Sequence, residues 1–300
     1  MRSAAKNYRN CVCVCHNKDY KFITNSLKTD SLTEEARKNL AYKAFSYVRK
    51  YDQCIENYFQ QQVEEKNHND RLPEKMTLDL EKEVDLSYGE NPHQKAALFT
   101  SNLDREKCGF EVLKGDNLSY NNLLDLDSGY RLLGELSTYN SVIILKHNNP
   151  CAVAIDKDSF YAALSKSLTC DPLCAFGGVI MTNFVIDDEC AKKLKGYFFD
   201  CIAAPGVTDQ ARVILNAKKR CKLIKVPSLS SKTHSPYLNI KNIFSGFLLQ
   251  GSPESVAPSA TWTAQTQYQL EKKDLESLNF AMIVAKHVKS NAIVICSDDR

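Results

Sequence analysis

The stretch SVIILKHNNPC, residues 141–151, decides how the chain is interpreted, because an apolar run ends there in a group of polar residues. Residues 141–145 are short and almost wholly apolar, which is typical of a strand buried inside a sheet. Lys146 and His147 follow directly. In open α/β sheets, ligands bind beyond the carboxyl ends of the strands. The segment therefore predicts a buried strand that brings Lys146 and His147 to a binding site.

An adjacent lysine and histidine have a chemical meaning if both face one pocket. A cation beside an imidazole lowers the pKa of the imidazole, so that the neutral base is available near pH 7. The same ammonium can stabilise an oxyanion that develops on a carbonyl. Taken alone, the pair Lys146-His147 is better explained as a surface lysine beside a hydrogen-bonded structural histidine, so its interpretation depends on the rest of the chain.

Apolar and polar segments alternate on both sides of this strand, which is typical of α/β layers around a mostly parallel or mixed sheet. The patterns predict helices over 31–48, 122–138, 157–169, 186–199 and 272–289, and further strands over 8–15, 178–181 and 292–296. Ser31 and Glu34 have the spacing of a helix N-cap. The polar stretch 60–75 predicts a linker at a domain boundary, and the Ser/Pro/Thr-rich stretch 226–262 predicts an irregular or inserted region.

Composition excludes several classes of protein. The chain has 300 residues, 43% of them hydrophobic, and a net charge of only +3, which favours about two globular domains and argues against a dedicated nucleic-acid binder. No apolar run reaches the roughly 18 residues that a membrane helix needs. The N-terminus lacks the apolar core of a secretory signal. We therefore expect a cytoplasmic protein without nucleic-acid or membrane partners.

The chain contains 12 cysteines and no CxxC pair. Cys11, Cys13 and Cys15 alternate with valines, which would put them on one face of a strand beside His16 as a conceivable thiol metal site. Zinc sites usually combine closely spaced cysteine pairs from two places in the chain, so reduced and buried cysteines are the better interpretation. A zinc-deaminase site is also disfavoured, because Cys151 lacks the second cysteine of that signature. We expect no metal.

Four weaker signals each favour a structural role when taken alone. Residues 88–94, YGENPHQ, predict a turn that carries His93. Gly177 and Gly178 before a predicted strand allow a close backbone approach. Asp200 is expected at a helix end before a tight turn over 201–206. Asn291 stands at a helix-to-strand junction, where its amide can donate a hydrogen bond to a carbonyl oxygen.

Together, these segments resemble a known family much more closely than any one of them does. The formyltransferase domain of the bifunctional purine-biosynthesis enzymes, phosphoribosylaminoimidazolecarboxamide (AICAR) formyltransferase joined to IMP cyclohydrolase, is similar in the same order at YGENPHQ (88–94), LSYNNLLDLDSG (118–129), ILKHNNPC (144–151), DPLCAFGG (171–178), IAAPG (202–206), LNAKKR (215–220) and HVKSNAIV (287–294). Upstream, RSAAKN (2–7) and residues 31–59 resemble the end of the cyclohydrolase domain. The resemblance covers nearly the whole chain.

The resemblance implies a fold for each part of the chain. Residues 76–225 would form the first formyltransferase subdomain, a three-layer α/β/α, cytidine-deaminase-like unit. Residues 1–65 would be a C-terminal remnant of a methylglyoxal-synthase-like cyclohydrolase domain. Residues 226–300 would contain an irregular insertion and the start of a second formyltransferase subdomain. The family works as a homodimer.

The resemblance also implies an activity, the transfer of a formyl group from the cosubstrate 10-formyltetrahydrofolate to AICAR. In this chain His147 would be the general base, and Lys146 and Asn291 would stabilise the formyl oxyanion. Residues that match substrate-binding positions of the family are Tyr88, His93, Asn122, Phe176, Gly177 and Asp200. Lys6 matches a lysine of the cyclohydrolase site, which closes formyl-AICAR to IMP.

Two departures put activity in question. The family usually has arginine before the tyrosine of its YGxNPH motif, where it contacts the substrate phosphate, and this chain has Ser87. A hydroxyl cannot make a bidentate charge-assisted contact, although Lys95 is a possible substitute cation. The family also extends beyond both ends of the sequence, so we expect a truncated chain. The alternative is therefore a catalytically inactive remnant that acts only as a scaffold or a ligand-binding fragment.

Overall fold

The computed structural model describes residues 1–64, 72, 75–101, 109–229, 238–252, 256, 261–263, 265, 267 and 270–300. The chain divides into two compact units, Met1–Pro73 and Glu74–Arg300, and each is described by itself. The division falls within the polar stretch 60–75. Residues 60–64 belong to a helix, so the predicted linker is wrong for them, and most of the remaining stretch lies outside the described residues.

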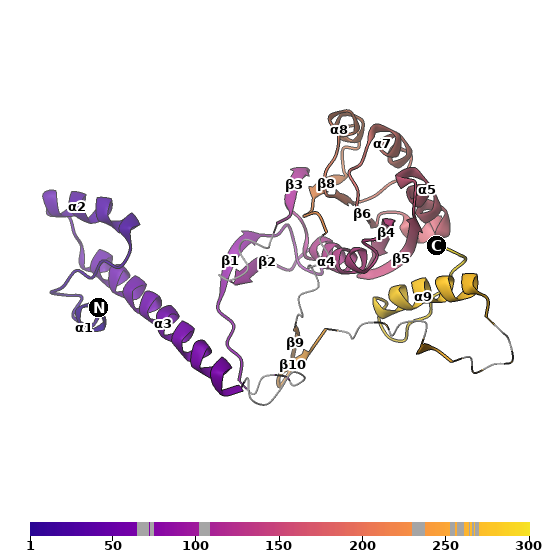
Figure 1. Ribbon diagram of the computed structural model, residues 1–300. Coiled ribbons are helices and arrows are strands. Elements are labelled where there is room, and N and C mark those ends of the chain that lie inside the picture. The colour runs from indigo at the N-terminus through magenta and orange to yellow at the C-terminus, as the bar shows by residue number, and fades with distance from the viewer. Residues whose placement is uncertain are drawn as a thin grey trace. The chain divides into compact units, whose positions relative to one another are not determined.

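The described part of the first unit is helical (Figure 1). Its elements are α1 (Arg2–Lys6), the 3-10 helix η1 (Asn17–Asp19), α2 (Tyr20–Lys28) and α3 (Glu34–Glu64). The small core contains Cys13, Ala5, Ala41 and Ala44. The predicted strand over 8–15 is wrong, because no strand lies within the described residues of this unit to pair with it, and residues 11–16 are irregular.

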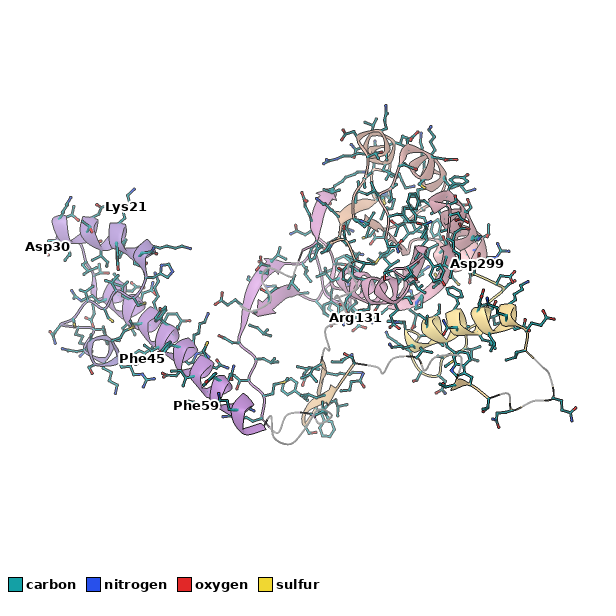
Figure 2. The ribbon with its side chains drawn as sticks, viewed as in Figure 1. Lys21, Asp30, Phe45, Phe59, Arg131 and Asp299 are labelled. Carbon is teal, nitrogen blue, oxygen red and sulfur yellow. The ribbon has the colours of Figure 1, made fainter. Side chains whose placement is uncertain are left out.

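Helix α3 begins later and extends much further than the pattern over 31–48 predicted. Thr33, not Ser31, caps it, since the Thr33 hydroxyl accepts the N–H of Ala36 at 3.1 Å. Beyond its first turns the helix carries large apolar side chains that are exposed, including the Phe45 and Phe59 labelled in Figure 2. The core of this unit therefore covers only the beginning of α3.

The second unit is built on a six-stranded mixed sheet with the strand order β3-β8-β7-β6-β4-β5. Its strands are β3 (Glu111–Lys114), β4 (Asn140–Lys146), β5 (Asn149–Asp156), β6 (Val179–Thr182), β7 (Cys201–Ala204) and β8 (Lys222–Lys225). Strands β6, β7 and β8 are parallel, whereas β4 is antiparallel to both β5 and β6. The predicted mixed sheet and the strand over 141–145 are confirmed.

The two faces of β4 enter two separate cores. Val142 and Ile144 pack into the first core, which is covered by α5 (Phe160–Cys170), α7 (Asp188–Lys195) and α8 (Asp209–Asn216). Ile143 and Leu145 pack into the second, which is covered by α4 (Tyr120–Glu135) and α9 (Lys272–Lys286). Strands buried on both faces are continuously apolar, which explains the run VIIL. The three-layer α/β/α fold is confirmed.

Helix α9 is joined to α4 by a charged contact as well as by apolar packing. The carboxylate of Glu135 accepts hydrogen bonds from Nε2 of His287 at 2.6 Å and from Nζ of Lys286 at 2.9 Å. Burial raises the pKa of Glu135, but the hydrogen bonds from His287 and Lys286 together lower it by a larger amount. The pKa of Glu135 therefore lies below its ordinary value. Paired in this way, the carboxylate is held charged between the two helices.

Other predicted elements differ from the structure in their bounds. Helix α7 begins only at Asp188, because the carboxylate of Asp187 caps it by accepting the N–H of Cys190 at 2.8 Å. Residues 201–204, predicted to turn, are the buried strand β7, so Asp200 precedes a strand and does not end a helix. A short helix, α6 (Pro172–Ala175), which was not predicted, follows α5.

Two hairpins complete the second unit. One pairs β1 (Leu80–Asp85) with β2 (Ala97–Ser101), and the other pairs β9 (Asn239–Ile243) with β10 (Gly246–Gln250). The prediction of an irregular region over 226–262 is therefore wrong for β9 and β10, while much of that region lies outside the described residues.

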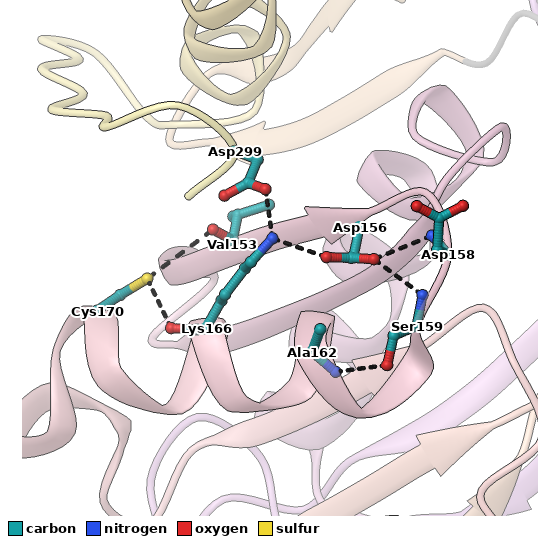
Figure 3. Close-up of polar contacts among 8 residues, drawn as sticks. All are labelled: Val153, Asp156, Asp158, Ser159, Ala162, Lys166, Cys170 and Asp299. Carbon is teal, nitrogen blue, oxygen red and sulfur yellow. Dashed lines mark hydrogen bonds and ion pairs between the residues drawn. The ribbon is translucent and has the colours of Figure 1, made fainter.

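The apolar segment 292–296 forms no strand, so that prediction is wrong. Ile293 is 84% exposed and Ile295 is 92% exposed. The chain is held to β5 just beyond this segment. Nζ of Lys166 contacts the carboxylates of both Asp156 and Asp299 (Figure 3). The N–H of Ile155 donates to the carbonyl of Asp299 at 2.9 Å. A strand needs a neighbour for its backbone groups, and none lies beside 292–296 among the described residues.

Candidate active site

Lys146 and His147 lie at a tight β-hairpin between β4 and β5. Lys146 is paired with Asn149, so His147 and Asn148 form the loop between the strands. Both loop residues have left-handed backbones, with φ of 54° for His147 and 60° for Asn148. Positive φ at both loop positions is the geometry of a type I′ hairpin, and Asn and His tolerate it better than most residues. The turn therefore presents His147, which is exposed, at its tip.

Helix α4 holds this turn in place. Oδ1 of Asp125 accepts the N–H of Asn148 at 2.6 Å, and Oγ of Ser128 bonds to Oδ1 of Asn148. Asp125 is buried, and Ser128 stands three residues further along the same face of α4. The left-handed loop is thus fixed by a carboxylate and a hydroxyl from one helix.

Electrostatics around Asp125 connect it with several predicted site residues. Burial is the largest effect and raises the pKa of Asp125. The Asn148 N–H and the charges of His147 and Lys289 lower the pKa, Asp200 raises it, and the net shift is upward. Asp125 therefore shares one electrostatic environment with the hairpin and with Asp200.

The ammonium of Lys146 is anchored to the loop before β6. It donates to the carbonyl of Phe176 at 2.9 Å. Gly177 follows with φ of 74°, which favours glycine, and its N–H donates to the carbonyl of Phe198 at 2.8 Å. A Cβ on Gly178 would lie 2.6 Å from the carbonyl oxygen of Leu145. The glycine pair thus allows this loop to approach the end of β4 closely.

Asn122 and Asp200 contact each other directly. Nδ2 of Asn122 donates to the carboxylate of Asp200 at 2.6 Å, and Oδ1 of Asn122 accepts the N–H of Ser119 in the cap of α4. Nζ of Lys222, on β8, lies 3.3 Å from the other carboxylate oxygen of Asp200. The side chain of Asn122 is therefore already engaged at both ends by the protein.

The segment that carries Asn291 also contacts the hairpin. The N–H of Lys289 donates to Oδ1 of Asn149 at 3.1 Å. Asn291 stands two residues further on and is exposed. Residues distant in sequence are thus brought to the same turn.

The turn predicted over 88–94 is confirmed and packs against the start of α4. The N–H of Gly89 donates to the carbonyl of Gln94 at 2.8 Å, and the N–H of Tyr120 donates to the carbonyl of Tyr88 at 3.0 Å. Ser87 and His93 are exposed. Tyr88 is thereby tied to the helix that holds the hairpin.

The structure thus links Lys146, His147, Asn122, Phe176, Gly177 and Asp200 through contacts of α4, the hairpin and the strand ends, and it ties Tyr88 to α4. Lys6 lies on α1 in the other unit and is exposed. Three residues of this arrangement were not predicted from the sequence: Asp125, Ser128 and Lys222. The first two had a signal: they follow Asn122 at intervals of three residues, which places all three on one face of a helix.

A cavity of about 450 Å³ between α9 and the end of β5 contains none of the predicted site residues. Five carboxylates line it, against two lysines: Asp156, Asp158, Glu276, Asp298 and Asp299. Such a lining repels an anion, so this cavity is a poor site for a phosphate or a folate carboxylate.

The described cysteines are free, and several are buried in the sheet. Burial raises the pKa of Cys221 to about 11 and that of Cys190 to about 12, which keeps these thiols neutral at pH 7. Within the described ranges, no three His, Cys, Asp or Glu side chains are placed to hold a metal ion, the group around Cys11, Cys13, Cys15 and His16 included. No described helix is long and apolar enough to cross a membrane.

A three-layer α/β unit whose polar side chains gather at a hairpin and at strand ends is typical of enzymes that act on small molecules. Comparison with known families defines the class further: the AICARFT/IMPCHase bienzyme family matches residues 4–300, and the chain belongs to that family. It is 36% identical over 300 residues to the bifunctional purine biosynthesis protein PurH of Desulfitobacterium hafniense, and 38% identical over 297 residues to that of Petrotoga mobilis. These alignments cover 98% of this chain but only 57% and 56% of those relatives, so the chain spans little more than half of their length.

Proposed function

We propose that the second unit contributes to formyl transfer from 10-formyltetrahydrofolate to AICAR, with His147 as the general base. The observation that carries this proposal is the hairpin loop, where Asp125 and Ser128 hold a left-handed turn that presents an exposed imidazole. Left-handed non-glycine residues cost on the order of 1–2 kcal/mol each. A turn held against that cost by a buried carboxylate is well suited to position a functional side chain.

The proposed reaction needs a base and a stabilised oxyanion. The amine of AICAR must lose a proton as it attacks the formyl carbon, and His147 takes that proton at an imidazole nitrogen. The bond from the formyl carbon to the folate nitrogen then breaks, and tetrahydrofolate leaves with that nitrogen protonated. Lys146 uses one of its three N–H groups on the Phe176 carbonyl, which leaves two for the formyl oxygen. Asn291 donates its amide from the segment that Lys289 ties to the hairpin. A general base typically contributes about 10²–10⁴-fold to such rates, and one oxyanion donor about 10²–10³-fold.

Substrate binding is assigned to the groups around this hairpin. Tyr88 and His93 come from the loop before α4, and Phe176 and Gly177 from the loop before β6. Asp200, held by Asn122 and Lys222, offers a carboxylate toward donors on the base. Lys6 is proposed for the cyclohydrolase reaction that closes formyl-AICAR to IMP. A homodimer, a cytoplasmic location and chemistry without a metal belong to the same proposal.

Ser87 favours the second candidate, a catalytically inactive remnant that keeps a scaffold or ligand-binding role. Its backbone N–H donates to Leu118, but its hydroxyl offers no charge to a phosphate. A Ser87→Arg variant addresses this directly. If the site is built for AICAR, the arginine should lower the KM for AICAR severalfold while kcat changes little.

The test of the proposed function is formyl transfer by the purified chain with both substrates. The expected result is measurable transfer that His147→Ala reduces by about 10²-fold or more. The matched control is His16→Ala, an exposed histidine of the first unit, which should leave the rate unchanged. Equal rates for the unsubstituted chain and His147→Ala would show that His147 is not the base. Rates no higher than background in the chain and in Ser87→Arg would favour the remnant.

A further inference from the structure

A second cavity, of about 420 Å³, lies where α7 and α8 end. Its lining is strongly basic, with Lys195, Lys218, Lys219 and Arg220, and no aspartate or glutamate lines it. The segment LNAKKR that supplies most of these cations has no part in the proposed formyl transfer. None of the residues assigned to that reaction lines this cavity.

Two lysines already donate to the terminal carbonyl groups of the helices beside the cavity. Nζ of Lys218 donates to the carbonyls of Lys195, at 3.2 Å, and Tyr197, at the end of α7. Nζ of Lys114 does the same for α8, through the carbonyls of Leu215 at 3.0 Å and Asn216 at 3.2 Å. Carbonyls at helix C-termini are the partners that lysines satisfy there. The other cations of the cavity are therefore not needed for capping.

Lys195, Lys219 and Arg220 remain as uncompensated charges. Their side chains make no hydrogen bond or ion pair with any of the described residues. Burial is the largest cause that lowers the pKa of Lys218, and the nearby charge of Lys114 lowers it as well. Cations that line one cavity without an acidic partner repel each other, and a bound anion would relieve that repulsion.

An exposed aromatic ring completes the lining. Phe198 borders the cavity and packs against Phe176, with 5.0 Å between the ring centroids. Both rings are exposed to solvent. An apolar ring beside three cations suits a ligand that combines a flat aromatic group with several negative charges.

We propose that this cavity binds a nucleoside di- or triphosphate, with its phosphates on Lys195, Lys219 and Arg220 and its base against Phe198. Arg220 supplies a planar fork for two phosphate oxygens, and the lysines supply point charges. The site is distinct from the proposed formyl-transfer site, and it does not depend on that function.

The test is calorimetric titration of the whole chain with ATP. The expected result is one saturable site whose affinity falls at least tenfold in the double variant Lys219→Glu/Arg220→Glu. The matched control is Lys157→Glu, an exposed lysine away from this cavity, which should bind ATP as the unsubstituted chain does. An unchanged ATP affinity in the double variant, with unchanged circular dichroism, would overturn the proposal.

Two further measurements separate this site from its alternatives. His147→Ala should bind ATP with unchanged affinity. A loss of ATP affinity in this variant would place ATP at the hairpin and overturn the proposal of a distinct site. Phe198→Leu should weaken ATP severalfold and leave inorganic tripolyphosphate unchanged; equal effects on both would contradict a role for the base. A single-stranded RNA that binds more than tenfold tighter than ATP would also overturn a small-molecule site.

Discussion

Two short apolar segments of the second unit, residues 141–145 and 292–296, have similar sequences and different structures. The first is the body of β4, lies between β5 and β6, and is fully buried. The second has no strand partner among the described residues, and its two isoleucines, Ile293 and Ile295, are exposed. Val294 and Cys296 still pack against the second core. Strand-forming residues therefore become a strand only where another edge receives their backbone groups.

The difference comes from what stands next in the sequence. After residue 145 the chain reverses within the loop of His147 and Asn148, so β5 returns as a neighbour at the smallest cost in loop entropy. After residue 296 the chain turns through Ser297 and Arg300, and the Asp299 carbonyl accepts a hydrogen bond from the backbone of β5. The hairpin that creates the candidate site thus also makes β4 a strand.

The largest effect is expected when a buried side chain of β4 is shortened. Ile144→Ala removes a fully buried side chain from the first core and should lower the free energy of unfolding by about 2–5 kcal/mol. Urea denaturation followed by circular dichroism measures this change. A loss below 1 kcal/mol would mean that β4 is not the centre of the core.

Much of the fold was predictable because its signals are local. The apolar run over 141–145 and the helical periodicity of α4, α5 and α9 were recognised in the sequence, since burial on one face or on both leaves a pattern. Residues 8–15 and 292–296 were misjudged because strand pairing depends on segments elsewhere in the chain. Strand β7 was taken for a turn, since Pro205 and Gly206 directly follow its four residues.

The second largest effect is expected at Asp125, whose carboxylate holds the loop of His147 and Asn148. Asp125→Ala leaves the Asn148 N–H without its acceptor and should cost roughly 1–3 kcal/mol at pH 7. Because the folded pKa of Asp125 is raised above its ordinary 3.8, the folded state holds this proton longer, and its contribution to stability decreases as the pH rises through the folded pKa. In Asp125→Ala, the free energy of unfolding measured by urea denaturation from pH 3 to 8 should no longer show this decrease with rising pH. The same pH dependence in both proteins would contradict the assignment.

The site was less predictable than the fold, for a physical reason. Lys146 and His147 were found because they follow a buried strand directly. Asp125 and Ser128 act on the hairpin through the Asn148 backbone and side chain, and such a contact leaves no mark in the sequence around residue 148. Lys222 meets Asp200 only because β7 and β8 are neighbours in the sheet.

A smaller effect is expected where the C-terminal segment is tied to β5. The pKa of Asp156 is lowered to about 2, mainly by the hydrogen bond from the Lys166 ammonium. The stability from this pair is therefore present above pH 3.8 and is lost as the pH falls toward 2. Lys166→Met should reduce that acid-side loss, since the backbone N–H groups of Asp158 and Ser159 still lower the pKa of Asp156, and it should cost about 1 kcal/mol at pH 7. Hydrogen exchange at the Ile155 amide, which donates to Asp299, should become faster in the variant. Unchanged exchange would show that the segment is held without Lys166.

The smallest effect is expected in the unpaired segment itself. Ile293→Ser and Ile295→Ser change side chains that are already in water, so each should alter the free energy of unfolding by no more than about 0.5 kcal/mol. Val294→Ser is the matched control, because Val294 packs against the second core and should cost more than either isoleucine. If the isoleucine substitutions cost as much as Ile144→Ala, then 292–296 is covered in solution by another strand, and the contrast with β4 would disappear. If they do not, pairing rather than sequence separates these two segments.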